Sequence, residues 1–273
     1  MTLVRDLLSW GGERLGSDAE GRNEAYLLLA YTLGRDRSWL YAWPDTRVDG
    51  PDERRYRELI ERRTKGEPFA YLTGTKEFWS LSLAVDRHTL IPRPETEDLV
   101  AHILTRFPAH PGLSLIDLGT GSGAIALALA SERPQWHISA TDQNAATLGR
   151  ARANAHRLGL TVDFVQADWL QGITGPFDIV VSNPPYVACG DDHLNDLSYE
   201  PDAALVSGND GLNDIRRIIP QARERLAPGG WLIFEHGFDQ GEASRDLLHQ
   251  HAYRNVATGQ DLAGKDRFSY GQI

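Results

Sequence analysis

The segment LSLIDLGTGSGAIALALASER, residues 113–133, decides the fold of this chain. It begins with a short apolar run at 113–118, passes through three glycines, and ends with the helix-forming run AIALALASER at 124–133. A buried strand that turns through glycines straight into a helix is typical of an open α/β sheet that binds a nucleotide-like ligand at the turn. The segment therefore predicts the first strand, turn and helix of such a sheet.

Strand and helix patterns continue to alternate after this segment. A helix is expected at 144–159. Four further strands are predicted at 137–142, 162–168, 177–186 and 231–236, the last of them after the turn Pro228-Gly229-Gly230. Strands that alternate with helices favour a mainly parallel, twisted sheet with helices on both faces. We therefore expect an α/β, Rossmann-like domain over residues 93–273.

Residues 1–73 have a different pattern, which predicts a small all-helical domain. Apolar residues recur at helical spacing near the start of the chain, and the run 23–33 ends at the stop signal Gly34. A third helix is expected from Pro51 to about Gly66. Its many arginines fit either a solvated surface or a docking face for an acidic or ribonucleoprotein partner.

Residues 74–92 are expected to link the two domains through a β-hairpin. The stretch FWSLSLAV at 78–85 has the alternation and the aromatic content of a strand. Prolines then stiffen the chain, and a helix is expected from about Pro94, with acidic residues in its first turn. Arg93 and Glu95 are equally consistent with a domain-linking cap and with a wall of the cofactor or substrate entrance.

Composition and charge exclude several classes of protein. Hydrophobic residues make up 41% of the 273, and the net charge of −10 lies almost entirely after residue 73, which is unfavourable for gripping a phosphate backbone. No apolar run approaches the ~20 residues of a membrane span. Cys189 is expected to be an inert loop thiol, and no Cys/His cluster has zinc spacing, so no metal site is predicted. We expect a cytoplasmic monomer with no direct nucleic-acid or membrane partner.

The ends of three predicted strands describe a nucleoside pocket. Asp142 ends the second strand, where a carboxylate suits two ribose hydroxyls, and Asp168 with Trp169 ends the third, where an acid and a flat ring suit an adenine. The glycine spacing G-x-G-x-G departs from the dinucleotide pattern, so no pyrophosphate site is expected. The candidate cofactor residues are Asp117, Gly119, Thr120, Gly121, Ser122, Gly123, Asp142, Asp168, Trp169 and Asn183.

The sequence Asn183-Pro184-Pro185-Tyr186 closes the fourth predicted strand and indicates the chemistry. A carboxamide or exocyclic amine nitrogen is a weak nucleophile because its lone pair is delocalised. The Asn183 side-chain oxygen and the Pro184 carbonyl can accept its two N–H groups, and Tyr186 offers a flat face for stacking. Asn183, Pro184 and Tyr186 are the expected catalytic residues, and all four residues are expected to contact the substrate, with positioning supplying most of the catalysis.

These motifs resemble those of known methyltransferases. Residues from about 112 to 272 are similar to the class I S-adenosylmethionine-dependent methyltransferases, and Asn-Pro-Pro-Tyr resembles the motif of those that act on planar nitrogens. Four further segments resemble the HemK/PrmC family of release-factor glutamine methyltransferases: GEPFAYLTGTKEFWSLSL (66–83), LIPRPETEDLV (90–100), YEPDAALVSGNDGL (199–212) and DLAGKDRFSYGQ (261–272). The resemblance extends over essentially the whole chain, including the helical domain.

The resemblance implies a methyl donor, S-adenosyl-L-methionine, and an acceptor, the N5 amide nitrogen of the glutamine in the Gly-Gly-Gln motif of class I peptide chain release factors. It implies that the glycine turn, supported by Asp117, faces the methionine part of the donor. It further implies that Asp142 holds the ribose and that Asp168 and Trp169 contact the adenine. It also implies that the helical domain helps to dock the release factor, whose modification tunes translation termination.

Two other functions are weighed against this one. A nucleic-acid adenine N6-methyltransferase would share the Asn-Pro-Pro-Tyr motif, but it needs a basic groove, and the negative charge of the second domain opposes one. A non-catalytic module that only senses the cofactor would have no need of Asn183 and Tyr186. Both of these residues are present, which favours an enzyme.

Overall fold

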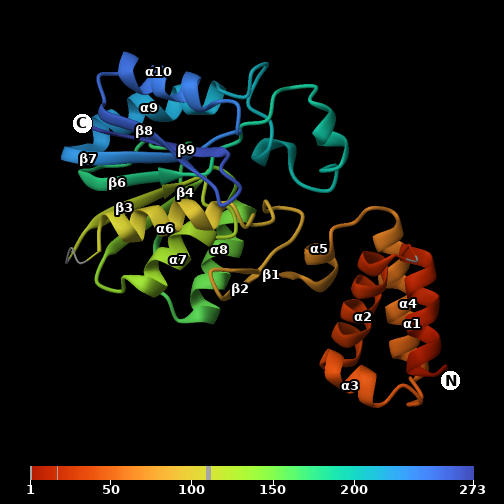
Figure 1. The fold of residues 1–273 in the computed structure, drawn as a ribbon. Coiled ribbons are helices and arrows are strands. Elements are labelled where there is room, and N and C mark those ends of the chain that lie inside the picture. Colours follow the sequence, from red (N-terminus) through yellow and green to blue (C-terminus); the bar gives the residue numbers. More distant parts are fainter. Residues whose placement is uncertain (1, 17, 109–111) are drawn as a thin grey trace. The chain divides into compact units, whose positions relative to one another are not determined.

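The computed structural model describes residues 2–16, 18–108 and 112–273 (Figure 1). The chain forms two compact units, Met1–Gly74 and Thr75–Ile273. Each unit has its own hydrophobic core. Within the described residues, no helix is both long enough and apolar enough to cross a membrane.

The first unit is helical throughout. Its helices are α1 Val4–Leu15, α2 Ala19–Leu33, α3 Arg37–Ala42, α4 Gly50–Thr64 and α5 Phe69–Thr73. The carboxylates of Asp18 and Asp49 cap α2 and α4 by accepting backbone N–H groups at 2.8 and 2.9 Å. The short helices α3 and α5 were not predicted, because six and five residues are too few to show a helical repeat of apolar side chains.

A β-hairpin opens the second unit, with strands β1 Thr75–Phe78 and β2 Leu81–Ala84. The β-hairpin predicted within residues 74–92 is confirmed, and its two-residue turn lies inside the strand-like stretch 78–85. Trp79 and Ser80 form the turn with φ of 51° and 59°. Positive φ at both central residues is the geometry of a tight hairpin turn, although neither residue type signals it.

The rest of the second unit is a seven-stranded sheet in the order β5-β4-β3-β6-β7-β9-β8 (Figure 1). The strands are β3 Ser114–Leu118, β4 His137–Asp142, β5 Asp163–Gln166, β6 Phe177–Ser182, β7 Leu226–Glu235, β8 Arg254–Gln260 and β9 Asp266–Gln272. The pairs from β5 to β7 are parallel, and β9 is antiparallel to both β7 and β8. The predicted α/β class with a mainly parallel sheet is therefore confirmed.

Helices cover both faces of this sheet (Figure 1). The helices are α6 Thr96–Arg106, α7 Ala124–Glu132, α8 Ala145–Leu158, α9 Asn213–Arg225 and α10 Gly241–Gln250. Neighbouring strand residues point to opposite faces: Leu115 packs with apolar residues of α6, α7 and α8, whereas Ile116 packs with those of α9 and α10. Both faces are buried, which explains why the central strands read as continuous apolar runs.

Several element boundaries differ from those predicted. The helix expected from about Pro94 begins at Thr96, and β7 begins at Leu226, so that the expected turn at Pro228-Gly229-Gly230 lies within this strand. Helix α9 escaped prediction because Pro220 lies inside it, where a proline normally argues against a helix. Strand β8 is half-exposed at the sheet edge and carries a polar sequence, so it has no apolar run to reveal it.

Candidate functional site

A pocket of about 280 Å³ opens where the parallel strands end. Brought together around it are seven of the residues predicted to bind cofactor or substrate: Gly119, Gly121, Asp142, Asp168, Trp169, Asn183 and Pro185. They come from the last residue of β4 and from the segments that follow β3, β5 and β6. The carboxyl ends of parallel strands meet at one edge of the sheet, so residues far apart in the sequence converge there.

Asp142 ties the pocket to the glycine turn. One carboxylate oxygen accepts the backbone N–H of Gly121 at 3.1 Å, and the other accepts that of Asn144 at 2.9 Å. Burial raises the pKa of Asp142, and the two N–H groups oppose that rise. Each oxygen keeps a second lone pair, so the carboxylate can still accept hydroxyl groups from the pocket.

The ring of Trp169 packs against the glycine turn. A methyl group built on Gly119 would lie 3.0 Å from Cζ3 of this ring, so the turn and the indole fit only because residue 119 has no side chain. Trp169 is buried, its own φ is +55°, and its backbone oxygen accepts the hydroxyl of Thr141 at 3.1 Å. The indole is therefore held in place as one wall of the pocket.

Replacing Gly119 by alanine tests this contact. We expect the variant to raise the Kd of S-adenosylmethionine at least tenfold, about 1.4 kcal/mol, because the added methyl group displaces the Trp169 ring. Gly159→Ala is the matched control, since Gly159 has the same positive φ (+68° against +66°) but open space around the added methyl group. Calorimetric titration should show normal affinity for the control, and equal affinities in the two variants would refute the role of the contact.

The other residues of the glycine turn lie behind the pocket. Asp117 is buried beneath the turn and accepts the hydroxyl of Thr120 at 2.6 Å, and burial raises the pKa of Asp117 to about 7. Thr120 and Ser122 are buried too, and a methyl group on Gly123 would lie 2.9 Å from Leu127 of α7. These four residues shape the turn from behind, and their expected contacts with a cofactor stay predictions.

Asp168 lines the pocket with a partner that the sequence did not suggest. Its Oδ2 pairs with the guanidinium of Arg217 on α9 at 2.5 Å and accepts the side-chain amide of Gln171 at 3.1 Å. These bonds leave the second carboxylate oxygen for a ligand. Arg217 lies on helix α9, which was not predicted. No local pattern in the sequence therefore indicated this ion pair.

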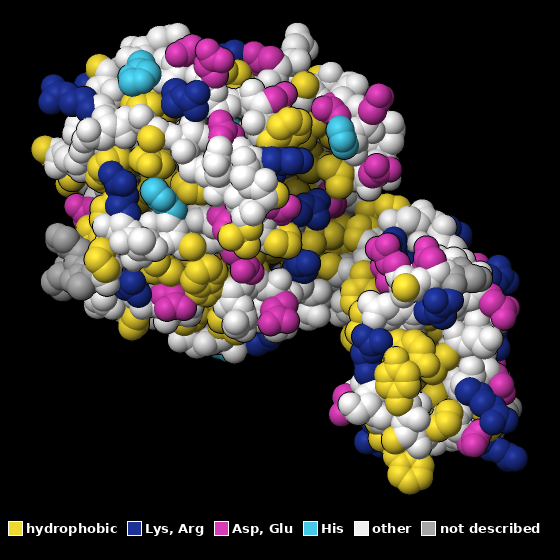
Figure 2. Space-filling view, viewed as in Figure 1, with side chains coloured by type: hydrophobic (Ala, Val, Ile, Leu, Met, Phe, Trp, Pro, Cys, Tyr) yellow, Lys and Arg dark blue, Asp and Glu magenta, His cyan; other side chains and the backbone are white. Residues whose placement is uncertain are grey.

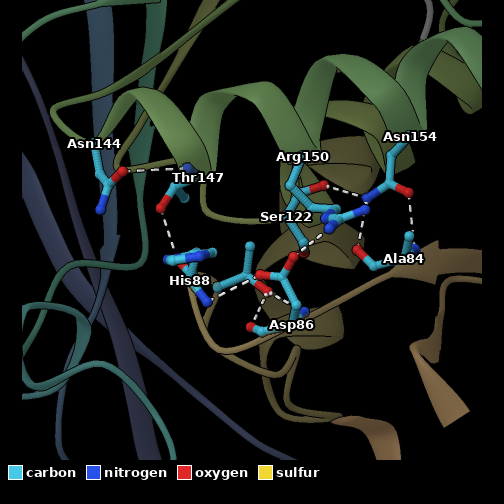
Figure 3. A network of polar contacts seen from close by, with 9 residues as sticks. Ala84, Asp86, His88, Ser122, Asn144, Thr147, Arg150 and Asn154 are labelled. Carbon is cyan, nitrogen blue, oxygen red and sulfur yellow. Dashed lines mark hydrogen bonds and ion pairs between the residues drawn. The ribbon is translucent and has the colours of Figure 1, made fainter.

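The segment after the hairpin forms a further wall of the pocket, through His88 and Leu90. Figure 3 shows how helix α8 holds this segment. Thr147 donates its hydroxyl to the backbone oxygen of His88 at 2.6 Å, and Arg150 forms an ion pair with Asp86. The sequence placed this segment in an inter-domain linker, and no pattern in it signalled a contact with the pocket.

Asn154 is the central side chain of this network (Figure 3). It is fully buried on α8, and its oxygen accepts the backbone N–H of Ala84 at 2.8 Å. Its nitrogen donates to the oxygen of Ala84 at 3.0 Å and to that of Ser122 at 2.9 Å. One amide thus joins the end of the hairpin, the glycine turn and α8.

Removing this amide should destabilise the second unit. Asn154→Ala leaves three buried or half-buried backbone groups without their partner, which we expect to cost about 3 kcal/mol and to lower Tm by about 5–10 °C. The matched control is His156→Ala, an exposed position on the same helix, where the expected change is within ~0.5 kcal/mol. Urea titration of both variants checks the difference, and similar midpoints would contradict it.

The Asn-Pro-Pro-Tyr corner is joined to a buried acid. Asn183 donates its side-chain N–H to the hydroxyl oxygen of Thr96 at 3.2 Å, and Thr96 donates to one oxygen of Glu235 at 2.7 Å. The hydroxyl of Tyr186 donates to the other oxygen of Glu235 at 3.1 Å. The side chain of Gln240 donates to the backbone oxygen of Tyr186 at 3.0 Å, which holds the corner from a second side.

The side-chain oxygen of Asn183 is the other end of this amide. This oxygen is buried and has no hydrogen-bond partner among the described residues. A buried acceptor without a donor is costly unless a ligand supplies the donor. Asn183 lines the pocket, so this oxygen is suited to accept an N–H group from a bound substrate.

Comparison with known proteins gives a consistent result. The family model described as PrmC N-terminal domain matches residues 6–74, and the one described as Methyltransferase small domain matches residues 96–198. Release factor glutamine methyltransferase from Xylella fastidiosa strain 9a5c is 47% identical over 255 residues, which cover 92% of this chain and 93% of that protein. The Pseudomonas aeruginosa protein of the same name is 44% identical over 276 residues, covering 100% and 99%. The chain belongs to the release factor glutamine methyltransferase family.

Solved structures share the fold of this family member at low sequence identity. A methyltransferase from Pyrococcus furiosus matches with a TM-score of 0.54 and 19% identity, covering 80% of this chain and 97% of its own. The hMettl16 catalytic domain matches with a TM-score of 0.56 and 17% identity, covering 82% of each chain. These likenesses confirm the class I methyltransferase fold.

Sequence reasoning missed two parts of the site in this family member. Thr96 lies in the segment LIPRPETEDLV but was given no role, and Glu235 lies in none of the quoted motifs. The two meet only because α6 packs against β7.

Arg93 was left between a domain-linking cap and a wall of the entrance, and neither alternative included its ion pair with the buried Glu200, which also accepts the backbone N–H of Ile91 at 2.9 Å. That pair joins the chain just after one pocket-lining segment, His88 to Leu90, to the chain just before another, which begins at Pro201.

Proposed function

We propose that this protein transfers a methyl group from S-adenosyl-L-methionine to the side-chain amide nitrogen (N5) of a glutamine, the one in the Gly-Gly-Gln motif of class I peptide chain release factors. Membership in the release factor glutamine methyltransferase family supports the reaction and the class of substrate. The observation that carries the proposal is Asn183, which lines the pocket and whose buried side-chain oxygen has no hydrogen-bond partner among the described residues.

The pocket suits S-adenosylmethionine. Asp142 is placed to accept ribose hydroxyls, Trp169 offers a flat surface to the adenine, and the second oxygen of Asp168 remains for the adenine amino group. The glycine turn allows a ligand to approach the backbone at Gly119 and Gly121. When bound, this cofactor supplies an electrophilic methyl group on a sulfonium.

The substrate carboxamide is oriented at the proline corner. The oxygens of Asn183 and Pro184 accept its two N–H groups, which directs the nitrogen lone pair toward the methyl donor, and the ring of Tyr186 packs against the amide plane. Orientation replaces the strong base that such a weak nucleophile would need in solution. The proton released from the product nitrogen passes to water or to a nearby acceptor.

The helical unit is proposed to help dock the release factor. Large aromatic side chains remain exposed on it, with Tyr41 and Trp43 at 59% and 60% exposure. Figure 2 shows hydrophobic side chains gathered on the visible face of this unit, with Lys and Arg side chains beside them. Arginine lies against aromatic rings here, as Arg55 does over Tyr31 at 5.1 Å. Aromatic and arginine side chains are the types enriched at protein interfaces.

Methyl-labelled cofactor tests the proposal against its rival, a nucleic-acid adenine N6-methyltransferase. The enzyme is incubated separately with a purified class I release factor, DNA and RNA. We expect label in the release factor alone, and none when its Gly-Gly-Gln glutamine is replaced by alanine. Label in DNA or RNA, with the release factor unlabelled, would reject the proposal in favour of the rival.

A further inference from the structure

We propose that Glu235, acting through Thr96, is a positioning residue that keeps the Asn183 amide turned with its oxygen toward the substrate. This inference rests on the proposed function, because it concerns how that site orients a carboxamide. Three side chains from three different segments form the relay: Asn183 after β6, Thr96 at the start of α6 and Glu235 at the end of β7.

The direction of each hydrogen bond follows from the chemistry of Glu235. An ionised carboxylate has no proton to give, so both of its oxygens accept, one from Thr96 at 2.7 Å and the other from Tyr186 at 3.1 Å. Because the single hydroxyl proton of Thr96 is committed to Glu235, the Thr96 oxygen can only accept from Asn183. The amide must then present its N–H to Thr96, at 3.2 Å, and its oxygen to the pocket.

Without this relay the amide has no fixed orientation. A threonine hydroxyl can donate as readily as it accepts, and the two ends of an asparagine amide have nearly the same shape. A reversed amide would point its N–H groups at the N–H groups of the substrate carboxamide. That contact is repulsive, so the reversed state holds the substrate nitrogen in an unproductive position.

Protonation of Glu235 would reverse the relay. A proton on Oε2 must be donated to Thr96, whose own hydroxyl then turns toward Asn183 and requires the amide oxygen there. Burial and, to a lesser extent, the carboxylate of Glu95 raise the pKa of Glu235, whereas the Thr96 and Tyr186 hydroxyls and the charge of Arg267 lower it, and the net pKa is about 7. The ionised form dominates above this pKa, so kcat is expected to rise with pH through about 7 and then level off.

Three conservative variants test the relay with the full-length enzyme, a release factor substrate and S-adenosylmethionine. Glu235→Gln keeps the shape but adds a donor, and Thr96→Val removes the hydroxyl. We expect each to lower kcat about 10- to 100-fold with the Kd of the cofactor changed less than about threefold. Thr96→Ser should restore kcat to within about threefold of wild type. Glu235→Gln should also lose the rise of kcat near pH 7.

The matched control is Tyr253→Phe. Tyr253 is buried like Thr96, and its hydroxyl donates to the backbone oxygen of Ile219 at 3.0 Å, away from the pocket. The control should keep kcat within about twofold. If Thr96→Val and Glu235→Gln behave like this control, the relay is refuted. If circular dichroism shows that one variant is unfolded, the other two variants and the pH profile of the wild type still decide whether the relay operates.

Infrared difference spectroscopy gives a readout that does not depend on catalysis. In the cofactor-free protein, a protonated buried carboxyl absorbs apart from ionised ones, and this band should disappear with a midpoint near pH 7 in the wild type. Asp117 is also buried, with a pKa raised to about 7, so the band of Glu235→Gln should keep the Asp117 contribution and lack only that of Glu235. A transition of equal size in the wild type and in Glu235→Gln would overturn the inference. By contrast, a wild-type enzyme that methylates no release factor would overturn the proposed function, whatever the infrared spectrum shows.

Discussion

Asn183→Ala is expected to lower kcat by about 10²- to 10³-fold, the loss typical of removing one preorganised polar group at a reacting centre. The substitution deletes the buried side-chain oxygen of this pocket-lining residue, which has no partner among the described residues, so the substrate carboxamide loses one of its two proposed acceptors. Single-turnover transfer of labelled methyl to a release factor measures the effect.

Cofactor affinity separates this loss from damage to the pocket. Asn183 contributes one side chain to a wall whose ribose and adenine positions lie elsewhere, so the Kd of S-adenosylmethionine should change less than about threefold. A variant that binds the cofactor normally and still transfers methyl at near wild-type rate would show that Asn183 is not catalytic. A variant that loses cofactor binding would assign the residue to the cofactor instead.

Asp142→Ala is expected to have the complementary effect, raising the Kd of S-adenosylmethionine about 10²-fold. Hydrogen bonds to a charged acceptor contribute about 1.5–3 kcal/mol each, and this carboxylate can accept two ribose hydroxyls. It also holds the backbone N–H of Gly121, so its loss loosens the glycine turn. Calorimetric titration should give the same ratio of variant Kd to wild-type Kd for S-adenosylmethionine and for its demethylated product.

Asp163→Ala is the matched control for this substitution. It removes one carboxylate from the start of the neighbouring strand β5, at an exposed position outside the pocket. Its cofactor affinity should equal that of the wild type. If the two variants bind alike, Asp142 does not hold the ribose. At saturating cofactor, Asp142→Ala should regain most of its kcat, because the substrate corner is unchanged.

The central strands β3 and β6 were predictable because most of their residues are buried, so that they read as short apolar runs. Strand β4 was predicted at its observed limits, 137–142. The pocket residues at the ends of β3, β4 and β6 were predictable for a related reason. Parallel strand ends share one edge of the sheet, so Gly119, Asp142 and Asn183 had to lie near each other.

The residues that support the site were not predictable. Thr96, Glu235 and Asn154 sit in ordinary helix or strand sequence, and their roles depend on which elements pack together. The β-hairpin was predicted, but the place of its turn at Trp79 and Ser80 was not. Residues that seldom adopt positive φ occupy the turn, so their types did not mark it, and tertiary contacts support it. The bond from Glu97 to the backbone N–H of Trp79, at 2.8 Å, is one such contact.

Peptide mass spectrometry of a class I release factor tests the central claim, that this corner methylates a glutamine side-chain amide. The release factor is incubated with S-adenosylmethionine and either wild-type enzyme or Asn183→Ala, digested, and fragmented. The predicted result is one added methyl group on the side-chain nitrogen of the Gly-Gly-Gln glutamine with the wild type, and an unmodified peptide with the variant. A methyl group on any other residue, or the same yield from the variant, would contradict the account.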